Sequence, residues 1–129
     1  MLDIDHFKKV NDTYGHQGGD TVLRALGTLL TKQYRITDIL GRYGGEEFGI
    51  LLLDTTTEMA LSLAENLSSE LANTAILHDQ KEIKITISFG ITQINESFKS
   101  HDQWIDMADK ALYQSKQNGR NRATVLNCK

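Results

Sequence analysis

The sequence predicts an α+β fold in which a mostly antiparallel central sheet is backed by helices. Short strand-like runs alternate with helical stripes along the 129 residues, and a pair of glycines separates two neighbouring apolar runs. No repeat, low-complexity tract or linker interrupts this pattern. We therefore expect one domain over residues 1–129, with the element order β-α-α-β-β-α-β-α-β.

The first elements are an opening strand and two helices. The strand covers the alternation of apolar and acidic residues at positions 1–5. The short helix that follows has the apolar face Phe7, Val10 and Tyr14. We expect Gly15 to end this helix, residues 15–19 to form a loop, and Asp20 to cap a second helix that ends near Tyr34.

The middle of the chain has the pattern of a hairpin followed by a helix. Two apolar runs over residues 39–53 flank Gly44 and Gly45, which we expect at the hairpin tip, where the backbone can need positive φ. The polar residues 54–57 can cap the next helix. Its apolar stripe is Ala60, Leu63, Ala64, Leu67 and Leu71.

The last third predicts a strand, a helix and a short strand. Between residues 83 and 89, large apolar residues alternate with Lys84, Thr86 and Ser88, which predicts a strand with one face in the core and one in solvent. The final helix and strand are marked by the apolar residues Trp104, Met107, Ala108, Ala111 and Leu112 and by residues 123–126.

Composition excludes several classes of protein. The net charge of −3 and a pI near 5.7 argue against a protein that coats nucleic acid through a broad basic surface. The single cysteine, Cys128, has no partner for an internal disulfide, which favours a reducing, cytoplasmic setting. No apolar run approaches the roughly 18 residues of a membrane span, so we expect no direct membrane contact by this segment, although a membrane-anchored parent protein can carry it.

The motif Gly44-Gly45-Glu46-Glu47 is the most informative stretch for function. Paired glycines leave the backbone bare enough for a ligand to lie against it. The two acids point to opposite faces if a strand begins there, so one of them can hold a cation. The alternative is an ordinary hairpin with a solvated acidic edge.

Asp3 and Asp5 form a second acidic pair. They share one face of the opening strand while Ile4 turns inward, and paired carboxylates at a strand end are a common arrangement for Mg²⁺ completed by phosphate oxygens. If Asp3 lies beside Glu46 across neighbouring strands, the two can bridge one or two ions. The alternative is an exposed strand with solvated acids.

Cations occur in two places, at Lys8 and Lys9 and at Lys116 and Arg120. Lys116 and Arg120 are four residues apart, so they share a face if the helix persists. A helix C-terminus favours cations in any case, and spacing alone leaves both interpretations open.

Together these residues resemble the GGDEF domain, the catalytic unit of diguanylate cyclases, in the variant that reads Gly-Gly-Glu-Glu-Phe at residues 44–48. Residues 3–12, 14–20, 88–91 and 108–121 resemble the other blocks of the family in the same order. The resemblance implies a fold similar to nucleotidyl cyclase and polymerase palm domains. The family's preceding helix is absent from this sequence, so we expect a fragment of a protein with an upstream sensor or regulatory domain.

The resemblance implies a metal site and catalytic roles. Asp3, the main-chain carbonyl of Ile4 and Glu46 resemble ligands of Mg²⁺, with Mn²⁺ as the alternative, and Glu47 would assist a second ion. Glu46 is also implied as the base that takes the proton of a ribose 3′-hydroxyl. Lys8 would stabilise charge near the phosphates.

The substrate contacts that the resemblance implies fall into two groups. Asn11 and Asp20 would read the guanine edge, with His16 nearby, since such a pair accepts and donates hydrogen bonds in a pattern that favours guanine over adenine. The remaining substrate-binding residues are Phe7, Gly44 and Gly45, and the clamp on the terminal phosphates, Lys116 and Arg120.

The implied reaction joins two GTP molecules into cyclic di-GMP and releases two pyrophosphates, across two antiparallel copies of the domain. Arg35 and Asp38 resemble the RxxD site at which the product inhibits many relatives; the alternative is an unrelated surface Arg and Asp. Two other functions stay open at this level: a non-catalytic module that senses cyclic di-GMP or GTP, and a dimerisation or scaffold domain.

Overall fold

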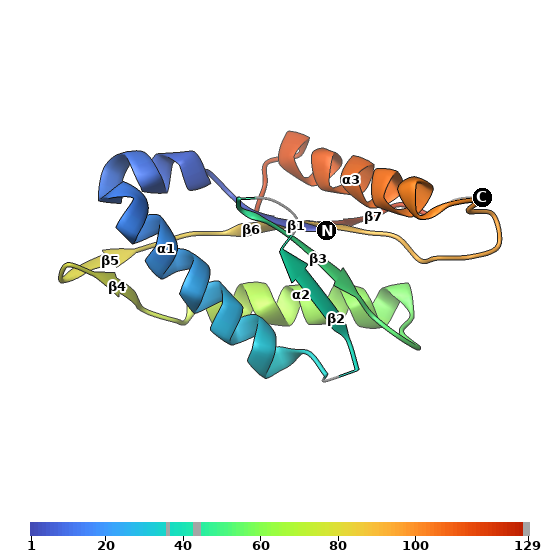
Figure 1. Cartoon of the computed structure of the whole chain (residues 1–129), viewed down its shortest axis with the longest axis horizontal. Helices are drawn as coiled ribbons and strands as arrows, with labels where there is room; N and C mark the ends of the chain where they lie inside the picture. Colours follow the sequence, from blue (N-terminus) through green and yellow to red (C-terminus); the bar gives the residue numbers. More distant parts are fainter. Residues whose placement is uncertain (36, 43–44, 128–129) are drawn as a thin grey trace.

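The structure is a computed structural model that describes residues 1–35, 37–42 and 45–127 (Figure 1). Its strands are β1 (Leu2–Ile4), β2 (Ile39–Arg42), β3 (Glu47–Leu51), β4 (Ile76–His78), β5 (Lys81–Ile83), β6 (Ile87–Ile91) and β7 (Ala123–Val125). Its helices are α1 (Phe7–Gln33), α2 (Thr57–Ala72) and α3 (His101–Gln117).

The larger sheet has the strand order β2-β3-β1-β6-β7, and β4 pairs with β5 in a separate hairpin. Neighbours in the larger sheet are antiparallel except for β6 and β7, which run parallel. The expected α+β class with a mostly antiparallel sheet is confirmed. None of the helices in the described ranges combines the length and apolarity that a membrane span requires.

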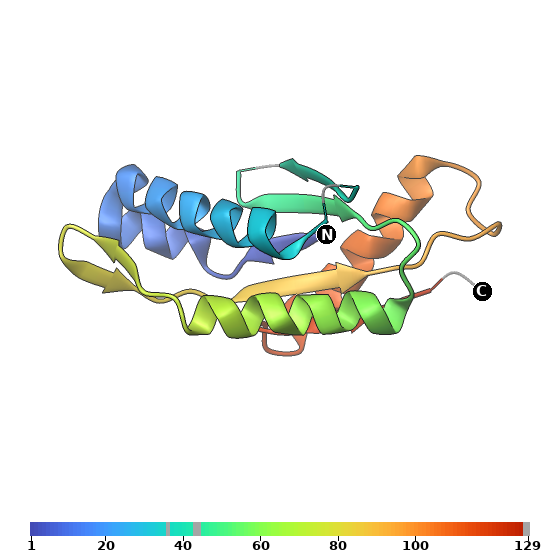
Figure 2. The ribbon, with the colours of Figure 1, turned by 90° about the horizontal axis from the view of Figure 1, so that it is seen from below.

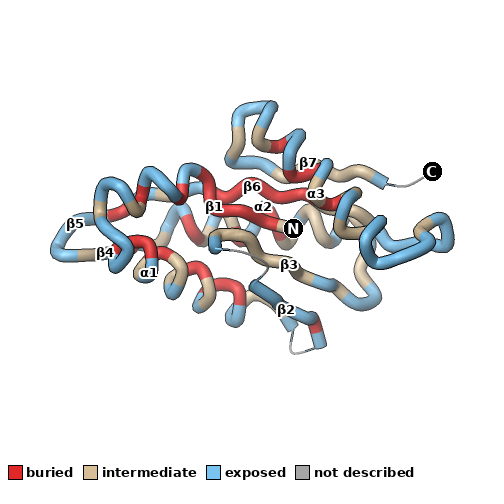
Figure 3. Tube along the Cα trace, turned by 45° about the horizontal axis from the view of Figure 1, so that its top comes forward, coloured by how far each residue is buried: buried red, intermediate tan, exposed pale blue. Residues whose placement is uncertain are grey.

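The two faces of the sheet differ in chemistry because side chains alternate along each strand. Leu2 and Ile4 of β1 lie in the main core with Ile87 and Phe89 of β6, and this core is completed by residues of α1 and α2. The opposite face carries Asp3 and Ser88 and is covered by α3, which lies apart from α1 and α2 (Figures 1 and 2). Figure 3 shows β1 and β6 buried along most of their length and the edge strand β2 exposed.

Gly15 divides helix α1 into two helical parts at a kink, so the predicted end of the first helix at Gly15 is confirmed. Only Gly15 leaves helical geometry, with φ 77° and ψ 171°, a conformation that glycine adopts without strain. Gly18 and Gly19 are buried within the helix, so the predicted loop over residues 15–19 and the predicted cap at Asp20 are wrong. A Cβ at Gly18 would lie 2.4 Å from the Cβ of Tyr14, which shows that close packing, and not a turn, requires glycine there.

The hairpin and the helix after it follow the prediction. Leu40 of β2 pairs with Ile50 of β3, and Thr56 caps α2 by accepting a hydrogen bond from the Met59 amide. Gly44 lies outside the described residues. The positive φ expected at Gly44 and Gly45 stays a prediction.

The strand predicted over residues 83–89 is wrong in extent and in exposure. Residues 84–86 separate β5 from β6, and the partner strand β4 was not predicted. Ser88 is fully buried because α3 covers its face of the sheet. Gly90 permits this contact, since a Cβ there would lie 2.1 Å from the carbonyl oxygen of Ala108. The final helix and β7 confirm the remaining elements.

Candidate active site

The end of β1 places a buried carboxylate against the last turn of α3. Asp3 is 5% exposed, and the ammonium of Lys116 donates to its Oδ2. The other oxygen, Oδ1, is buried and accepts no hydrogen bond from the described residues. Because a buried polar atom almost always has a partner, an open carboxylate oxygen marks a position suited to an ion or a ligand.

Both acids of the glycine motif reach this strand end. Asp3 is directly opposite Glu47 in the pairing of β1 with β3, so the two side chains share a face. The amide of Ile4 donates to the carbonyl of Glu46 at 3.3 Å. The predicted neighbour of Asp3 was Glu46; the structure joins Glu46 to β1 through its main chain and places Glu47 across from Asp3.

Electrostatics agree with this placement. Burial, followed by the negative charges of Asp3 and Asp109, raises the pKa of the Glu47 carboxyl above its ordinary value. Lys116 acts in the opposite direction. Burial is also the main cause that raises the pKa of Asp109 on the facing side of α3. A cation bound between the acids would relieve this repulsion.

The donor set fits a hard cation completed by substrate. Within the described residues, no three His, Cys, Asp or Glu side chains gather as a closed metal cage. Mg²⁺ does not need such a cage, because it takes one or two carboxylates and fills its remaining positions with phosphate oxygens and water. The open Oδ1 of Asp3 beside the acids at residues 46–47 suits that mode, and the role of the Ile4 carbonyl stays a prediction.

Asp5 does not belong to this open set. It is 5% exposed, and its two oxygens accept hydrogen bonds from the hydroxyls of Thr86 and Ser88 and from the amide of Asn121. Both expectations for Asp5, a second carboxylate for the metal and a solvated surface acid, are therefore wrong. Its carboxylate is already saturated by neutral donors.

The first half of α1 gathers several predicted substrate residues. A Cβ at Gly19 would lie 1.9 Å from Oδ1 of Asn11 and 3.1 Å from Cζ of Phe7, so the absence of a side chain at residue 19 lets both residues pack there. Asn11 thereby lies next to the backbone that leads into Asp20. Lys8 and His16 are exposed on the same helix, and their predicted roles stay predictions.

Arg120 lies beyond α3, and not on it. The helix ends at Gln117 and Gly119 has φ +116°, so Lys116 and Arg120 do not share a helical face as the spacing suggested. The Arg120 amide donates to the Ser115 carbonyl at 2.9 Å, a bond that closes the helix C-terminus. Arg120 is only partly exposed in this turn.

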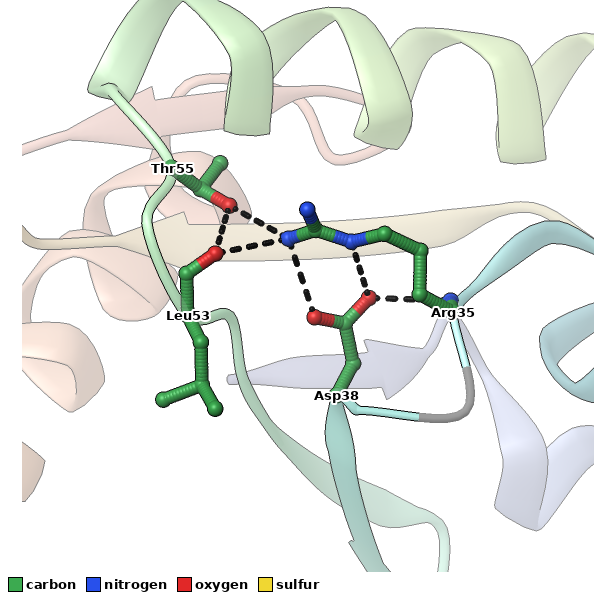
Figure 4. A network of polar contacts seen from close by, with 4 residues as sticks. All are labelled: Arg35, Asp38, Leu53 and Thr55. Atoms are coloured by element: carbon green, nitrogen blue, oxygen red, sulfur yellow. Dashed lines mark hydrogen bonds and ion pairs between the residues drawn. The ribbon is translucent and has the colours of Figure 1, made fainter.

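Arg35 and Asp38 form a second, separate ion pair (Figure 4). The guanidinium donates to both oxygens of Asp38 at 3.2 and 3.4 Å, and also to the Leu53 carbonyl at 2.7 Å and the Thr55 hydroxyl at 2.9 Å. Burial alone would raise the pKa of Asp38, but its hydrogen bonds and ion pair with Arg35 lower that pKa. Asp38 is thus held by Arg35, and the product-inhibition role of the pair stays a prediction; Ile36 between them lies outside the described residues.

A large apolar groove of about 630 Å³ lies elsewhere, between the β2–β3 hairpin, α2 and α3. None of the described residues predicted for the site lines it. The polar groups suited to a nucleotide therefore gather at the other end of β1 and not in this groove.

Sequence reasoning missed three contacting residues: Asp109 near Glu47, Thr55 at the Arg35 pair and Asn121 at Asp5. Thr55 and Asn121 act through a hydroxyl and a backbone amide, for which residue type gives little signal. Asp109 was detectable, because it lies seven residues before Lys116 and so recurs on the same side of α3.

The chain is similar to proteins of one known family. Residues 1–122 match the family model described as diguanylate cyclase, GGDEF domain. "Diguanylate cyclase A" of Treponema denticola is 44% identical over 97% of this chain, which spans 34% of that relative's length. The GGDEF domain of DgcB from Caulobacter crescentus, solved in complex with c-di-GMP, is 34% identical with a TM-score of 0.89, over 96% of this chain and 74% of the other.

A second solved structure is that of a GGEEF domain. The active GGEEF domain of a diguanylate cyclase from Vibrio cholerae is 34% identical to this chain. The TM-score is 0.86, over 99% of this chain and 81% of the other. Similarity at this level extends over the whole sheet and its three helices.

Proposed function

This chain belongs to the diguanylate cyclase, GGDEF domain family, and on that premise we propose that it condenses two molecules of GTP into cyclic di-GMP with release of two pyrophosphates. The chain spans about a third of the first relative's length, so further domains of a cytoplasmic parent protein would supply regulation and pairing. A signal-sensing domain upstream is part of the proposal.

One observation supports the catalytic function above the others. The buried Asp3 has one oxygen paired with Lys116 and one oxygen open, directly across from Glu47. A carboxylate held only for structure would have both oxygens satisfied, as Asp5 does. The open side suits Mg²⁺ or Mn²⁺, which when bound would neutralise phosphate charge between Asp3, Glu46 and Glu47.

In the proposed reaction a residue of the glycine motif accepts the proton of the attacking hydroxyl, and two lysines stabilise the phosphate. Glu46 accepts the proton of the 3′-hydroxyl, and that oxygen then bonds to the α-phosphorus of the GTP on the facing domain while the bond to pyrophosphate breaks. Lys8 and Lys116 stabilise the negative charge that develops on the phosphate oxygens. Each domain holds one GTP, so an antiparallel homodimer is required for turnover.

The remaining residues position the substrate. Asn11 and Asp20 read the guanine edge at the kink of α1, with Phe7 and His16 at the margins of that site. Gly44 and Gly45 allow the α-phosphate to approach the backbone. Arg120 binds the terminal phosphates through its planar guanidinium.

Product inhibition is a further part of the proposal. The GGDEF domain of DgcB was solved in complex with c-di-GMP, and in this chain Arg35 with Asp38 offers a cation and an acid for such a ligand. The Arg35 side chain is half exposed although it binds Asp38, so its guanidinium can meet a phosphate. Cyclic di-GMP would therefore bind here when product accumulates.

The test is turnover of GTP by the full-length protein in Mg²⁺, followed by chromatography of cyclic di-GMP. We expect Glu46→Ala to lower the rate by at least about 100-fold, which is typical when a catalytic electrostatic group is removed. Glu65→Ala removes an exposed acid from α2 and serves as the matched control. Equal rates for Glu46→Ala and the control would contradict the proposed chemistry.

The second candidate function is a non-catalytic sensor of cyclic di-GMP, and the hydrogen bonds between Arg35 and Asp38 favour it. A sensor would bind cyclic di-GMP and never produce it under any activating condition. Binding that survives Glu46→Ala and is lost in Arg35→Ala, together with no turnover in wild type, would establish the rival.

A further inference from the structure

Asp5 is a buried carboxylate that the catalytic proposal does not use. Its Oδ1 accepts from the Ser88 hydroxyl at 2.6 Å, and its Oδ2 accepts from the Thr86 hydroxyl at 2.6 Å and from the Asn121 amide at 3.0 Å. Its own amide donates to the Thr86 carbonyl at 2.9 Å. Asp5 therefore joins the end of β1, the start of β6 and the turn after α3.

The turn after α3 has an unusual backbone. Arg120 has φ 64° and Asn121 has φ 48°, and non-glycine residues adopt this left-handed region only where the surroundings hold them. Two backbone bonds hold the flanks, from the Arg120 amide to Ser115 and from the Phe89 amide to the Arg122 carbonyl. The bond from Asn121 to Asp5 holds the middle of the turn.

The direction of the Arg120 side chain depends on this turn. A change of φ at residue 120 or 121 rotates the Cα–Cβ bond of Arg120 relative to the sheet, and a long side chain amplifies that rotation at the guanidinium. Asp5 lies two residues after Asp3, so one short segment carries both the open carboxylate and the anchor of the turn.

We propose that Asp5 is a positioning residue for the substrate: its carboxylate fixes the turn of residues 119–122 so that Arg120 reaches the terminal phosphates of GTP bound at Asp3. This inference rests on the proposed function, in which Arg120 binds those phosphates. Asp5 itself touches neither metal nor nucleotide.

A purely structural role for Asp5 makes different predictions. Loss of a structural hydrogen-bond centre would weaken binding of every ligand of the domain and would act independently of Arg120. A positioning role affects only ligands that carry terminal phosphates, and it disappears when Arg120 is absent.

The experiment is calorimetric titration of the full-length protein with a non-hydrolysable GTP analogue and with GMP, both in Mg²⁺. Arg120→Ala is expected to weaken binding of the analogue by about 10-fold or more, since it removes charged hydrogen bonds, and to leave GMP binding within about 2-fold. Asp5→Ala is expected to reproduce that pattern. Lys84→Ala, at an exposed lysine between β5 and β6, is the charge control.

The double variant decides between the two roles. In the Arg120→Ala background, Asp5→Ala should weaken the analogue by less than about 2-fold further. If the two substitutions weaken binding of the analogue additively, or if Asp5→Ala weakens GMP binding equally, the positioning role is overturned. The role of Arg120 in binding the phosphates is then unaffected. If Arg120→Ala alone leaves binding of the analogue unchanged, the clamp of the proposed function fails and the role of Asp5 fails with it.

Two measurements keep the proposal testable if Asp5→Ala does not fold. Asp5→Asn can keep an oxygen toward Thr86 and Asn121 and turn its amide toward the Ser88 hydroxyl, which can accept, so this variant should bind the analogue within about 3-fold of wild type. In the wild-type protein, hydrogen exchange at the Asn121 amide should be slow although residue 121 is exposed. Exchange at the rate of an open loop, or a loss in Asp5→Asn as large as in Arg120→Ala, would overturn the proposal.

Discussion

Two pairs of a buried acid and a partly exposed cation differ in how completely the acid is satisfied. In both pairs the carboxylate is buried and the cation is partly exposed: the side chains are 7% and 30% exposed for Asp3 and Lys116, and 1% and 50% for Asp38 and Arg35. Both oxygens of Asp38 accept hydrogen bonds, one of them from the Arg35 amide. Oδ1 of Asp3 accepts none among the described residues.

The difference separates a closed pair from an open one. Burying a charge is unfavourable unless it is paired and hydrogen-bonded, so the closed pair at Asp38 contributes to the native structure. The open pair at Asp3 leaves part of that cost unrelieved, which is typical of sites held ready for a ligand. We infer that Asp38 is important for stability and Asp3 for turnover.

The largest difference predicted between Asp3 and Asp38 is in turnover. Asp3→Asn should lower the rate of cyclic di-GMP formation by at least about 100-fold, because the neutral amide cannot hold a cation beside the phosphates. Asp38→Asn should lower it by less than about 10-fold in assays that keep the product dilute. Initial rates with GTP measure both variants, and a reversal of the two effects would contradict the assignment.

The order of the two residues should be reversed for stability, with the larger loss of unfolding free energy at Asp38. Asp38→Ala is expected to lower the free energy of unfolding by about 2–3 kcal/mol, because it removes the carboxylate that accepts from the Arg35 amide and guanidinium. The effect is reduced by the half exposure of Arg35 and by the bonds that its guanidinium keeps to Leu53 and Thr55. Asp3→Asn should change it by less than about 1 kcal/mol. Chemical denaturation without nucleotide or divalent cation provides the comparison, and a larger loss for Asp3→Asn would show that the open pair is also structural.

The pH dependence of the unfolding free energy should differ in sign between Asp38 and Glu47. The pKa of Asp38 is lowered in the folded protein, so its contribution to stability is present above the unfolded value of 3.8 and is lost as the pH falls through the folded pKa. The difference in unfolding free energy between wild type and Asp38→Asn should therefore be constant near neutrality and shrink in acid.

Glu47 provides the opposite case. Its folded pKa is raised above 4.5, so the ionised side chain destabilises the metal-free protein above that folded pKa. Glu47→Gln should raise stability near neutrality by less than about 1 kcal/mol, since the side chain is partly exposed, and the gain should vanish as the pH falls below 4.5. A gain that grows in acid would contradict the proposed origin of the shift.

The smallest predicted effect is at Thr55, whose hydroxyl accepts from Arg35. Thr55→Val should free part of the guanidinium for the product and lower the concentration of cyclic di-GMP that inhibits half of the activity by about 2- to 3-fold. Thr28→Val is the control, because its hydroxyl donates to the Arg24 carbonyl within α1, away from Arg35. Weaker inhibition in Thr55→Val would indicate that the hydroxyl helps to bind the product.

The sequence predicted those parts of the fold that depend on local pattern. The hairpin of residues 39–53 and the final helix were predicted correctly, because apolar periodicity and capping residues act over short distances. The break of α1 at Gly15 was predicted correctly, but the loop predicted after it was too long, since Gly18 and Gly19 are helical and serve close packing. The split between β5 and β6 was missed, because the alternation of residues 83–89 continues across the break.

The candidate site shows the same limit. The acids at β1 and at the glycine motif were predicted to meet, and strand pairing brings them together. The position of Glu47 across from Asp3 depends on the register of β1 and β3. The full hydrogen bonding of Asp5 depends on a turn more than 100 residues away in the chain, at Asn121. No local pattern encodes such contacts, so only the assembled sheet and α3 show which carboxylate is open.

The central claim is that Oδ1 of Asp3 is held open for a metal ion beside the phosphates of GTP. A crystal structure of the protein with Mg²⁺ and a non-hydrolysable GTP analogue tests it most directly. We predict a cation bound to that oxygen, with further ligands from the acids at residues 46–47 and from the phosphates. A nucleotide bound with its metal elsewhere, and Asp3 contacting only Lys116, would contradict the claim.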